Sequence, residues 1–281
     1  MSDTVTLSLT EATALSTAAL TANGADAENA RAVTDIMIRA ERDRCASHGL
    51  FRLPGYCASL KSGKVKGTAR PIASEIAPGA VRVTGDGGFA PLALEVGLPV
   101  LAKKAKSQGI AGMGLVDIYH FAALWPEVET LAEQGLCAFA FTQASPMVAP
   151  AGGIKPFFGT NPMAWGIPTG DGQPPLISDF ATSAYAAGKV SLAISKGEAL
   201  PEGIIIDRDG NPATDPLALG LGGALLPFGT YKGYGLSMVI EIVASLLCGF
   251  APASSAEFQF GNPTLMMAIS IERFTTKERF E

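Results

Sequence analysis

Residues 81–142 decide the fold class: they contain VRVT (81–84), PLALEVGLPVLAKKAKS (91–107), IAGMGLV (110–116), FAALWPEVETLAE (121–133) and LCAFAFT (136–142). Short apolar runs are typical of buried strands, whereas longer stretches with apolar residues on one face predict helices. Strands and helices therefore alternate through this region, joined by short loops. Such alternation predicts right-handed crossovers and an α/β fold whose sheet is at least partly parallel.

The flanking sequence adds further elements. A helix capped by Thr10 is expected to end near Gly24, and a second helix capped by Asp26 follows it. Beyond residue 142 we expect strands at 163–167, 176–179 and 265–271, helices at 185–196 and 236–248, and turns over 201–216. No low-complexity linker separates these elements. We divide the chain into a helical N-terminal segment (residues 1–70) and an α/β cofactor and substrate domain (residues 71–281).

The composition is that of a globular protein, with 281 residues, of which 48% are hydrophobic and 17% charged. A net charge of −5 argues against nucleic acid as a partner, because phosphate binding needs basic patches. No apolar run reaches the roughly 18–20 residues that cross a bilayer, and the N-terminus lacks a signal-peptide pattern. The cysteines form no CxxC pair, which favours free thiols in the cytoplasm.

The usual motifs of nucleotide and metal enzymes are missing from the sequence. A Rossmann dinucleotide site needs G-x-G-x-x-G between a strand and a helix, and GLGG (220–223) lacks both the third glycine and that context. There is no P-loop, no nucleophile elbow and no metal-ligand spacing, so no metal is expected. Generic motifs alone therefore indicate only an α/β enzyme.

The first candidate constellation is Ser47-His48-Gly49 with Arg52, in the segment RDRCASHGLFRLPGY (42–56). His48 is one of only two histidines, and an imidazole can transfer a proton near neutral pH. Arg52 offers a fork of donors that suits a substrate carboxylate. The alternative interpretation is a solvated helix end with a capping histidine.

A second and a third constellation follow strands. HFAALWP (120–126) begins a helix, where free N–H groups can bind a phosphate or carboxylate; a core role for Phe121 and Trp125 is equally open. FGTNP (158–162) precedes SDFATS (178–183), in which Asp179 ends a strand and could orient an imidazole. A turn or N-cap role is the structural alternative for Asp179.

The fourth constellation is LPFGTYKGYG (226–235), in which glycines flank Lys232 just before a helix. Such a segment can cradle a phosphate, although it does not match the P-loop pattern. Alone it is a weak signal.

Together these segments resemble the malate/L-lactate dehydrogenase type 2 superfamily, and within it most closely the Δ1-piperideine-2-carboxylate/Δ1-pyrroline-2-carboxylate reductases. The resemblance rests on RD…SHGLFRLPGY (42–56), HFAALWPEVE (120–129), FGTNPMAWGIP (158–168), SDFATSA (178–184), DRDGNPATDP (207–216) and GGALLPFGTYKGYGLSM (222–238). It implies a mixed-sheet cofactor domain that is not a Rossmann fold, joined to a helical N-terminal domain. It also implies that the family's C-terminal helices are absent here, and that Ile118-Tyr119 replaces a Ser-His pair near the cofactor.

The resemblance implies a role for each matching residue. His48 is the proton donor, with Ser47 and Asp179 as its relay, and Arg52 and Thr160 bind the substrate. The expected cofactor contacts are His120, Phe121, Ala122, Ala123, Leu124, Ser178, Arg208, Thr230, Tyr231, Lys232, Gly233, Tyr234, Gly235 and Leu236. The cofactor is NADPH, with NADH as an alternative, and the protein is a cytoplasmic homodimer.

The expected reaction is hydride transfer from NAD(P)H to a cyclic 2-imino acid, giving L-pipecolate or L-proline. One alternative is an NAD(P)-dependent dehydrogenase of open-chain 2-hydroxy acids such as malate, L-lactate or ureidoglycolate. A second is a non-catalytic dinucleotide-binding protein. A hydrolase built on Ser47, His48 and Asp179 is disfavoured, because adjacent serine and histidine do not face each other easily and no nucleophile elbow is present.

Overall fold

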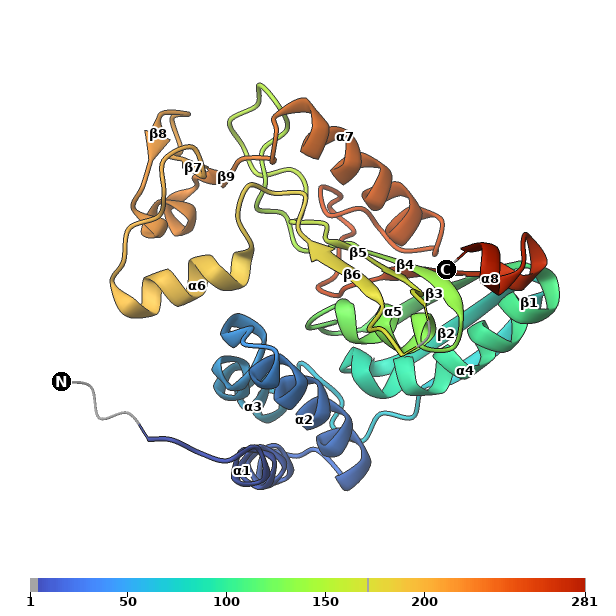
Figure 1. Cartoon of the computed structure of the whole chain (residues 1–281). Coiled ribbons are helices and arrows are strands. Elements are labelled where there is room, and N and C mark those ends of the chain that lie inside the picture. The colour runs from blue at the N-terminus through green and yellow to red at the C-terminus, as the bar shows by residue number, and fades with distance from the viewer. Residues whose placement is uncertain (1–4, 171, 281) are drawn as a thin grey trace.

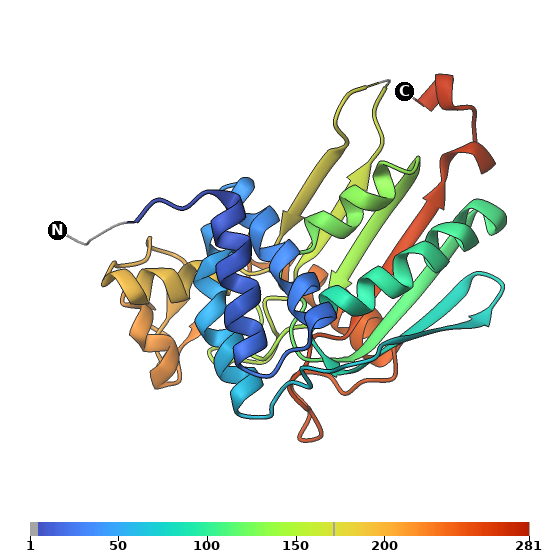
Figure 2. The same ribbon diagram turned by 90° about the horizontal axis from the view of Figure 1, so that it is seen from below.

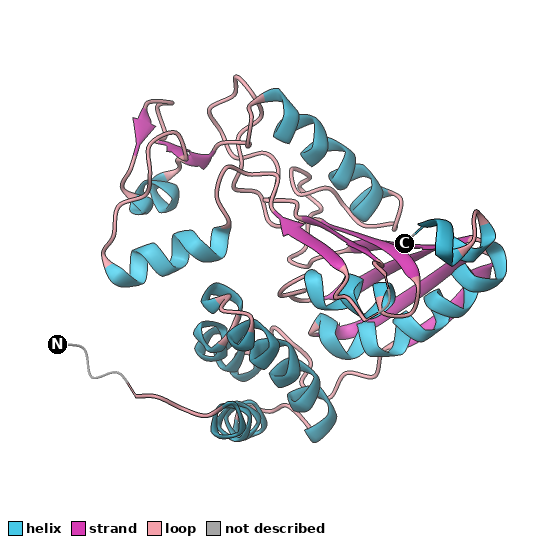
Figure 3. Ribbon diagram, in the orientation of Figure 1, coloured by secondary structure: helices cyan, strands magenta, loops and turns pink. Residues whose placement is uncertain are grey.

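The computed structural model describes residues 5–170 and 172–280, which form a large mixed sheet flanked by helices and a smaller three-stranded sheet (Figure 1). The large sheet has seven strands in the order β1-β2-β3-β10-β4-β5-β6. Its strands are β1 (Ile72–Ala77), β2 (Ala80–Gly88), β3 (Ile110–Ile118), β4 (Leu136–Thr142), β5 (Met163–Ile167), β6 (Leu176–Phe180) and β10 (Thr264–Ser270). Helices cover both faces of this sheet (Figure 3).

Only the pair β2–β3 is parallel among the paired strands described, and every other neighbour pair is antiparallel. The parallel pair is joined by α4 (Ala90–Gln108), which is the crossover that the sequence predicts. The expected mixed α/β fold is therefore confirmed, although the sheet is less parallel than the alternation suggests. The cause is the late strand β10, which inserts between β3 and β4 and runs antiparallel to both.

The central core lies where α4 and α5 (Trp125–Ala132) pack on one face of the sheet. Gly97 explains how α4 approaches so closely, because a Cβ at this position would lie 2.5 Å from the Met113 sulfur and 2.7 Å from Val83 Cγ2. Leu101 and Leu131 are completely buried in this cluster. Burying such a side chain contributes about 1.5–3 kcal/mol each.

The opposite face of the sheet is covered by α7 (Tyr231–Ile240) and the π-helical segment η4 (Glu241–Leu246) that continues it (Figure 1). The predicted helix over 236–248 therefore begins five residues earlier and changes its winding at Glu241. That carboxylate is buried and accepts hydrogen bonds from Gln143 and Asn161. These hydrogen bonds connect the helical segment α7–η4 to the loop between β4 and β5.

The N-terminal segment forms the helices α1 (Leu9–Ala22), α2 (Ala27–Arg42) and α3 (Leu53–Lys61). Helix α2 packs against α4, and α1 packs against α2 and α3. Asp26 caps α2 as predicted, accepting a hydrogen bond from the Asn29 N–H. The predicted Thr10 cap is wrong: Ser8 caps α1 in a reciprocal capping box with Glu11. Two short turns, η1 (Ala46–His48) and η2 (Leu50–Arg52), join α2 to α3.

The smaller sheet and α6 (Ala187–Lys196) form a separate lobe. Its strands are β7 (Ile205–Ile206), β8 (Pro212–Ala213) and β9 (Ala224–Leu225), with the turn η3 (Pro216–Leu221). Figure 2 shows the N-terminal helices between this lobe and the large sheet, and α6 contacts η1 directly. The chain ends in η5 (Ile271–Arg273) and the short helix α8 (Lys277–Phe280).

Candidate active site

The loop that carries His48 is shaped by Gly49. A Cβ at this position would lie 2.1 Å from the Glu41 carboxylate, which accepts a hydrogen bond of 2.7 Å from the Leu50 N–H. Gly49 has an ordinary φ of −88°. A side chain at 49 would therefore displace the closely approaching Glu41 carboxylate, and the backbone itself is not left-handed. This approach turns the chain back on α2 and holds η1 and η2 together.

Ser47 Oγ lies 3.1 Å from His48 Nδ1, so these adjacent side chains meet, although the sequence argument against a hydrolase expected them not to face each other easily. The Cys45 sulfur lies 3.5 Å from the same nitrogen. With Nδ1 occupied, Nε2 is the ring nitrogen left for a ligand. Burial lowers the pKa of His48 to about 4, and the positive charges of Arg52 and Lys189 add to this effect. The imidazole is therefore neutral at pH 7.

Arg52 is held against this loop and against α6. Its Nε donates a hydrogen bond of 2.7 Å to the Ser47 carbonyl oxygen, which leaves the outer guanidinium nitrogens for another acceptor. A Cβ at Gly188, in the first turn of α6, would lie 2.7 Å from Arg52 Nη2. Glycine at 188 thus lets α6 dock beside the guanidinium.

Asp179, at the end of β6, caps the start of α5. Its Oδ2 accepts hydrogen bonds from the backbone N–H groups of Leu124 (2.9 Å) and Trp125 (3.1 Å). Burial raises the pKa of Asp179, and these two hydrogen bonds partly offset the rise. Among the described contacts of Asp179 there is no hydrogen bond to His48, so its place in the relay stays a prediction and the capping interpretation accounts for its geometry.

The turn before α5 is fixed by side chains from distant parts of the chain. The Phe121 N–H donates to Asn262 Oδ1 at 3.2 Å, and the Tyr56 hydroxyl lies 3.0 Å from His120 Nδ1. Ala122 has a φ of 74°, a left-handed conformation that few non-glycine residues adopt. Burial lowers the pKa of His120 to about 3, so this ring is also neutral.

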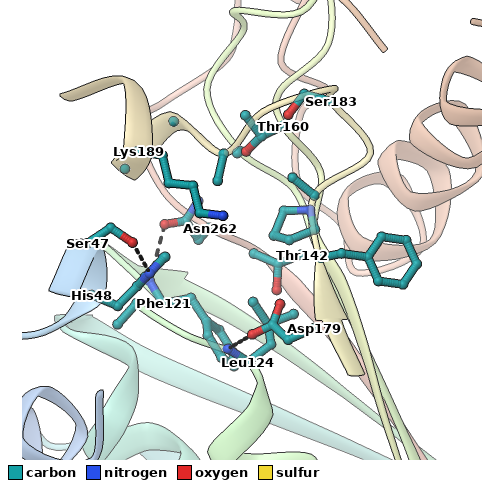
Figure 4. Close-up of a pocket in the computed structure, with 18 of the residues that line it drawn as sticks. Ser47, His48, Phe121, Leu124, Thr142, Thr160, Asp179, Ser183, Lys189 and Asn262 are labelled. Atoms are coloured by element: carbon teal, nitrogen blue, oxygen red, sulfur yellow. Dashed lines mark hydrogen bonds between the residues drawn. The ribbon is translucent and has the colours of Figure 1, made fainter. Parts of the chain in front are cut away.

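These groups open into one cavity of about 750 Å³. Figure 4 shows His48 and Ser47 on one side, Thr160, Thr142 and Asp179 across from them, and Lys189 extending into the space from α6. Its lining includes Ser47, His48, Arg52, His120, Phe121, Ala122, Leu124, Thr160 and Asp179. Sites for small molecules typically measure about 300–1,000 Å³. The cavity can therefore hold a planar nicotinamide ring together with a small acid.

The remaining predicted cofactor residues lie outside the lining of this cavity. Ala123 is buried behind the turn, and Ser178 precedes Asp179 on β6. Arg208 projects from the turn between β7 and β8, where its side chain is 74% exposed. Thr230, Tyr231, Lys232, Gly233, Tyr234, Gly235 and Leu236 form the start of α7. Their contacts with a dinucleotide stay a prediction.

Several residues of the cavity escape sequence reasoning, among them Lys189, Gly188 and Asn262. Lys189 and Gly188 lie in a segment predicted only to be a helix, and their signal is nothing more than a small residue followed by a charged one. Asn262 lies just before β10 and accepts a hydrogen bond from the Phe121 N–H, across 141 positions of sequence. No local pattern reports a contact at that separation.

Tyr119 accounts for one departure from the expected family pattern. Its ring packs on Phe260, with ring centroids 4.6 Å apart, and stands edge-on to Phe89. Its hydroxyl lies 3.4 Å from Ser59 Oγ. The tyrosine therefore joins the sheet to α3 beside the His120 turn.

The described residues contain no cluster of three or more side chains that could bind a metal ion. No helix within the described parts of the chain is long and apolar enough to span a membrane.

The profile of the malate/L-lactate dehydrogenase family matches residues 7–281. The chain belongs to this family. It is 48% identical over 249 residues to a Δ1-pyrroline-2-carboxylate reductase of Ancylobacter novellus, covering 89% of this chain and 72% of that protein. It is 50% identical over 219 residues to a Δ1-pyrroline-2-carboxylate/Δ1-piperideine-2-carboxylate reductase of Pseudomonas aeruginosa, covering 78% of this chain and 65% of that protein.

The crystal structure of a Δ1-piperideine-2-carboxylate reductase from Pseudomonas syringae pathovar tomato superposes with a TM-score of 0.90 at 38% identity, covering 99% of this chain and 86% of that one. The family and fold expected from the sequence are confirmed. Membership in this dehydrogenase family supports an NAD(P)-dependent oxidoreductase.

Proposed function

We propose that this protein transfers hydride from NAD(P)H to a cyclic 2-imino acid, converting Δ1-piperideine-2-carboxylate to L-pipecolate and Δ1-pyrroline-2-carboxylate to L-proline. The observation that carries the proposal is the convergence of His48, Arg52 and Thr160 on one cavity beside the turn over residues 120–124. A carboxylate clamp beside a proton-transfer group is what an imine next to a carboxylate requires. Relatives at 48% and 50% identity carry the names of such reductases.

A bound nicotinamide cofactor supplies the hydride, and NADPH is the proposed form, with NADH as an alternative. The turn over 120–124 and Ser178, together with Arg208 and the start of α7 at 230–236, are the residues proposed to hold it. The volume of the cavity is consistent with only the nicotinamide end of the cofactor lying beside His48. The outlying residues would contact the rest of the dinucleotide.

Arg52 is the proposed carboxylate clamp. Its Nε is already committed to the Ser47 carbonyl, which fixes the plane of the guanidinium. The outer nitrogens then face the cavity as a preorganised fork, and little rotamer entropy is lost when a carboxylate binds. Buried Thr160 contributes a hydroxyl to the same cavity.

His48 manages the proton that the imine nitrogen needs. The free site holds the imidazole neutral, because burial and two nearby cations lower its pKa to about 4. A substrate carboxylate at Arg52 neutralises one of these cations, so its binding raises the pKa of His48 and lets the ring carry a proton. Ser47, at 3.1 Å from Nδ1, orients the ring so that Nε2 faces the substrate.

Asp179 enters the proposal as a positioning residue of the relay. It fixes the backbone of Leu124 and Trp125, and the Trp125 ring stands against the imidazole. Its influence on His48 would pass through this ring. An Asp179→Asn variant with unchanged turnover would remove it from the relay.

A second candidate is the dehydrogenation of open-chain 2-hydroxy acids, which the description of the matching family favours. Both reactions use a carboxylate clamp and a proton-transfer group, so the same residues would serve. Assays of NADPH and NADH oxidation with piperideine-2-carboxylate, pyrroline-2-carboxylate, pyruvate and oxaloacetate separate them. Imine reduction at least tenfold faster than keto-acid reduction is expected, and the reverse order would replace the proposal. Cofactor binding without turnover on any of the four would leave a non-catalytic binding protein.

We also propose a homodimer in the cytoplasm. Apolar side chains stay exposed along α7 and η4 and at the residue after η4 in the single chain, including Val239 (54%), Leu246 (53%) and Leu247 (69%). A contiguous exposed apolar face is typical of an interaction surface. Light scattering that gives the mass of one chain at micromolar concentration would contradict the dimer.

A further inference from the structure

Two cationic side chains, Arg52 and Lys189, reach the His48 cavity from different elements. Arg52 comes from η2, and Lys189 comes from the first turn of α6, directly after Gly188. Figure 4 shows the Lys189 side chain directed into the cavity, toward the space between His48 and Thr160. Both positive charges act on the imidazole, since after burial they are the causes that lower the pKa of His48. The imidazole and the two cations therefore line one cavity.

The acids of the cavity do not neutralise Lys189. The Asp43 carboxylate accepts hydrogen bonds from Arg42 and from the Trp125 indole at 3.1 Å. Asp179 is committed to the backbone at the start of α5. Within the described residues, the recorded contact of the Lys189 ammonium is the face of the Tyr185 ring, 5.7 Å from its centroid. A substrate with a single carboxylate, clamped by Arg52, would leave this second charge without a partner.

We propose that Lys189 is a second anion-binding residue of the substrate pocket, and that the site takes a cyclic imine with a carboxylate on each side of the ring nitrogen. The inference rests on the proposed function and names its substrate class. The positions of the cations select this class: both line the cavity of the imidazole that serves the nitrogen, and in a 2,6-dicarboxylate both anions lie beside that nitrogen. In an open-chain keto acid such as oxaloacetate, the second carboxylate is attached through the reacting carbon, one bond farther from the heteroatom that takes the proton.

The reaction on Δ1-piperideine-2,6-dicarboxylate balances without another reactant. A bound reduced nicotinamide would supply a hydride, and hence two electrons, to the ring carbon of the C=N bond. The π electron pair of that bond goes to the nitrogen, which binds one proton. The products are piperidine-2,6-dicarboxylate and the oxidised cofactor.

The test compares Δ1-piperideine-2-carboxylate with Δ1-piperideine-2,6-dicarboxylate, by the loss of NADPH absorbance at saturating cofactor. It uses the whole chain, a Lys189→Met variant and a Lys196→Met control. Lys196 is exposed at the other end of α6 and does not line the cavity. Both variants remove one lysine charge from the same helix, so only the place of the charge differs.

We expect the unaltered chain to reduce the dicarboxylate with a kcat/KM at least equal to that for the monocarboxylate. In Lys189→Met the ratio of the two kcat/KM values should fall about 10- to 100-fold, as for the loss of a charge-assisted hydrogen bond. Lys196→Met should keep the ratio of the unaltered chain. A Lys189→Glu variant should lower the ratio further, because its carboxylate repels the second anion.

Four results would overturn the inference. Reduction of the monocarboxylate but not of the dicarboxylate would reject it and leave the proposed function standing. A ratio unchanged in Lys189→Met would show that another group meets the second anion. A rise in the KM for NADPH in this variant, with an unchanged ratio, would assign Lys189 to the cofactor. Absence of turnover on both imines would instead reject the proposed function, and the inference with it.

Discussion

The indole of Trp125 stands edge-on to the imidazole of His48, with ring centroids 6.4 Å apart and planes at 86°. The indole is itself fixed, because its Nε1–H donates to Asp43 Oδ2 at 3.1 Å and its backbone N–H donates to Asp179. Asp43 in turn pairs with Arg42 at 2.8 Å. The end of α2 and the start of α5 therefore meet at the Trp125 indole, which packs against the His48 imidazole.

Trp125→Phe should slow turnover while leaving the fold intact. Phenylalanine keeps an apolar ring but loses the N–H that reaches Asp43, a hydrogen bond that contributes about 1 kcal/mol. We expect kcat to fall about fivefold, with a smaller change in the KM for substrate. Steady-state kinetics on the imines check this, and thermal unfolding serves as the control for the fold. A kcat equal to that of the unaltered chain would show that the ring does not position His48.

His48→Ala should abolish most of the activity and spare cofactor binding. Removing a proton-transfer group typically lowers a rate by about 10²- to 10⁴-fold. Titration of NADPH fluorescence should give nearly the same Kd, since the ring is proposed to act on the substrate. An active His48→Ala protein would exclude His48 as the proton donor.

Arg52→Lys should weaken substrate binding although the charge is kept. Lysine lacks the fork that Arg52 presents, and it cannot donate to the Ser47 carbonyl with the same geometry. We expect the KM for the imine to rise about tenfold or more, which matches one lost charge-assisted hydrogen bond. Substrate saturation that stays the same in this variant would contradict the clamp.

Gly188→Ala tests whether the docking of α6 sets the position of Arg52. The added Cβ would lie 2.7 Å from Arg52 Nη2 and 3.2 Å from Ser47 Cβ, so the guanidinium must shift. Alanine favours a helix over glycine by about 0.5–1 kcal/mol, so stability should change little. The KM for substrate should rise severalfold. Gly55→Ala in α3 is the matched control, because a Cβ there meets nothing within 4 Å.

Much of the secondary structure is predictable because its signals are local. The apolar runs at 110–116 and 136–142 form β3 and β4, and the pattern over 91–107 forms α4. Strand β1 escapes prediction because residues 72–77 are mostly exposed and show little apolar periodicity. The place of β10 between β3 and β4 follows from contacts across about half of the chain, and no local propensity encodes them.

The residues of the candidate site also fall into two groups, those that a local motif predicts and those that only tertiary packing brings together. Ser47, His48 and Arg52 lie within six positions, so a local sequence motif is enough to group them. Lys189 reaches them only because Gly188 lets α6 approach η1, and that approach is a tertiary event. The family resemblance assigns Asp179 to the imidazole, whereas its recorded hydrogen bonds go to the start of α5. The backbone N–H groups at the start of α5 compete with the imidazole for the Asp179 carboxylate. Sequence alone cannot tell which of these two partners the carboxylate binds.

Glu127 gives the protein a pH dependence of stability that one substitution can isolate. This carboxyl group lies in the first turn of α5, is only 4% exposed, and has one oxygen without a hydrogen-bond partner. Burial raises its pKa from 4.5 to about 8, and the charge of Asp179 adds to the rise. Between these two pH values the folded chain holds a proton that the unfolded chain has released. The free energy of unfolding therefore falls as pH rises through this window.

Glu127→Gln removes this titration and keeps the size of the side chain. The variant should gain stability over the unaltered chain by at most about 1.4 kcal/mol per pH unit as pH rises from 4.5 to 8, and the gain should then level off. His48 and His120 act in the opposite direction, because their pKa values are lowered and stability rises with pH through their range. Both proteins contain these histidines, so they cancel in the difference between the two urea-unfolding curves. Glu133→Gln, at the exposed end of the same helix, controls for the loss of a carboxylate. A difference that stays constant across this pH range would show that Glu127 does not titrate as a buried acid.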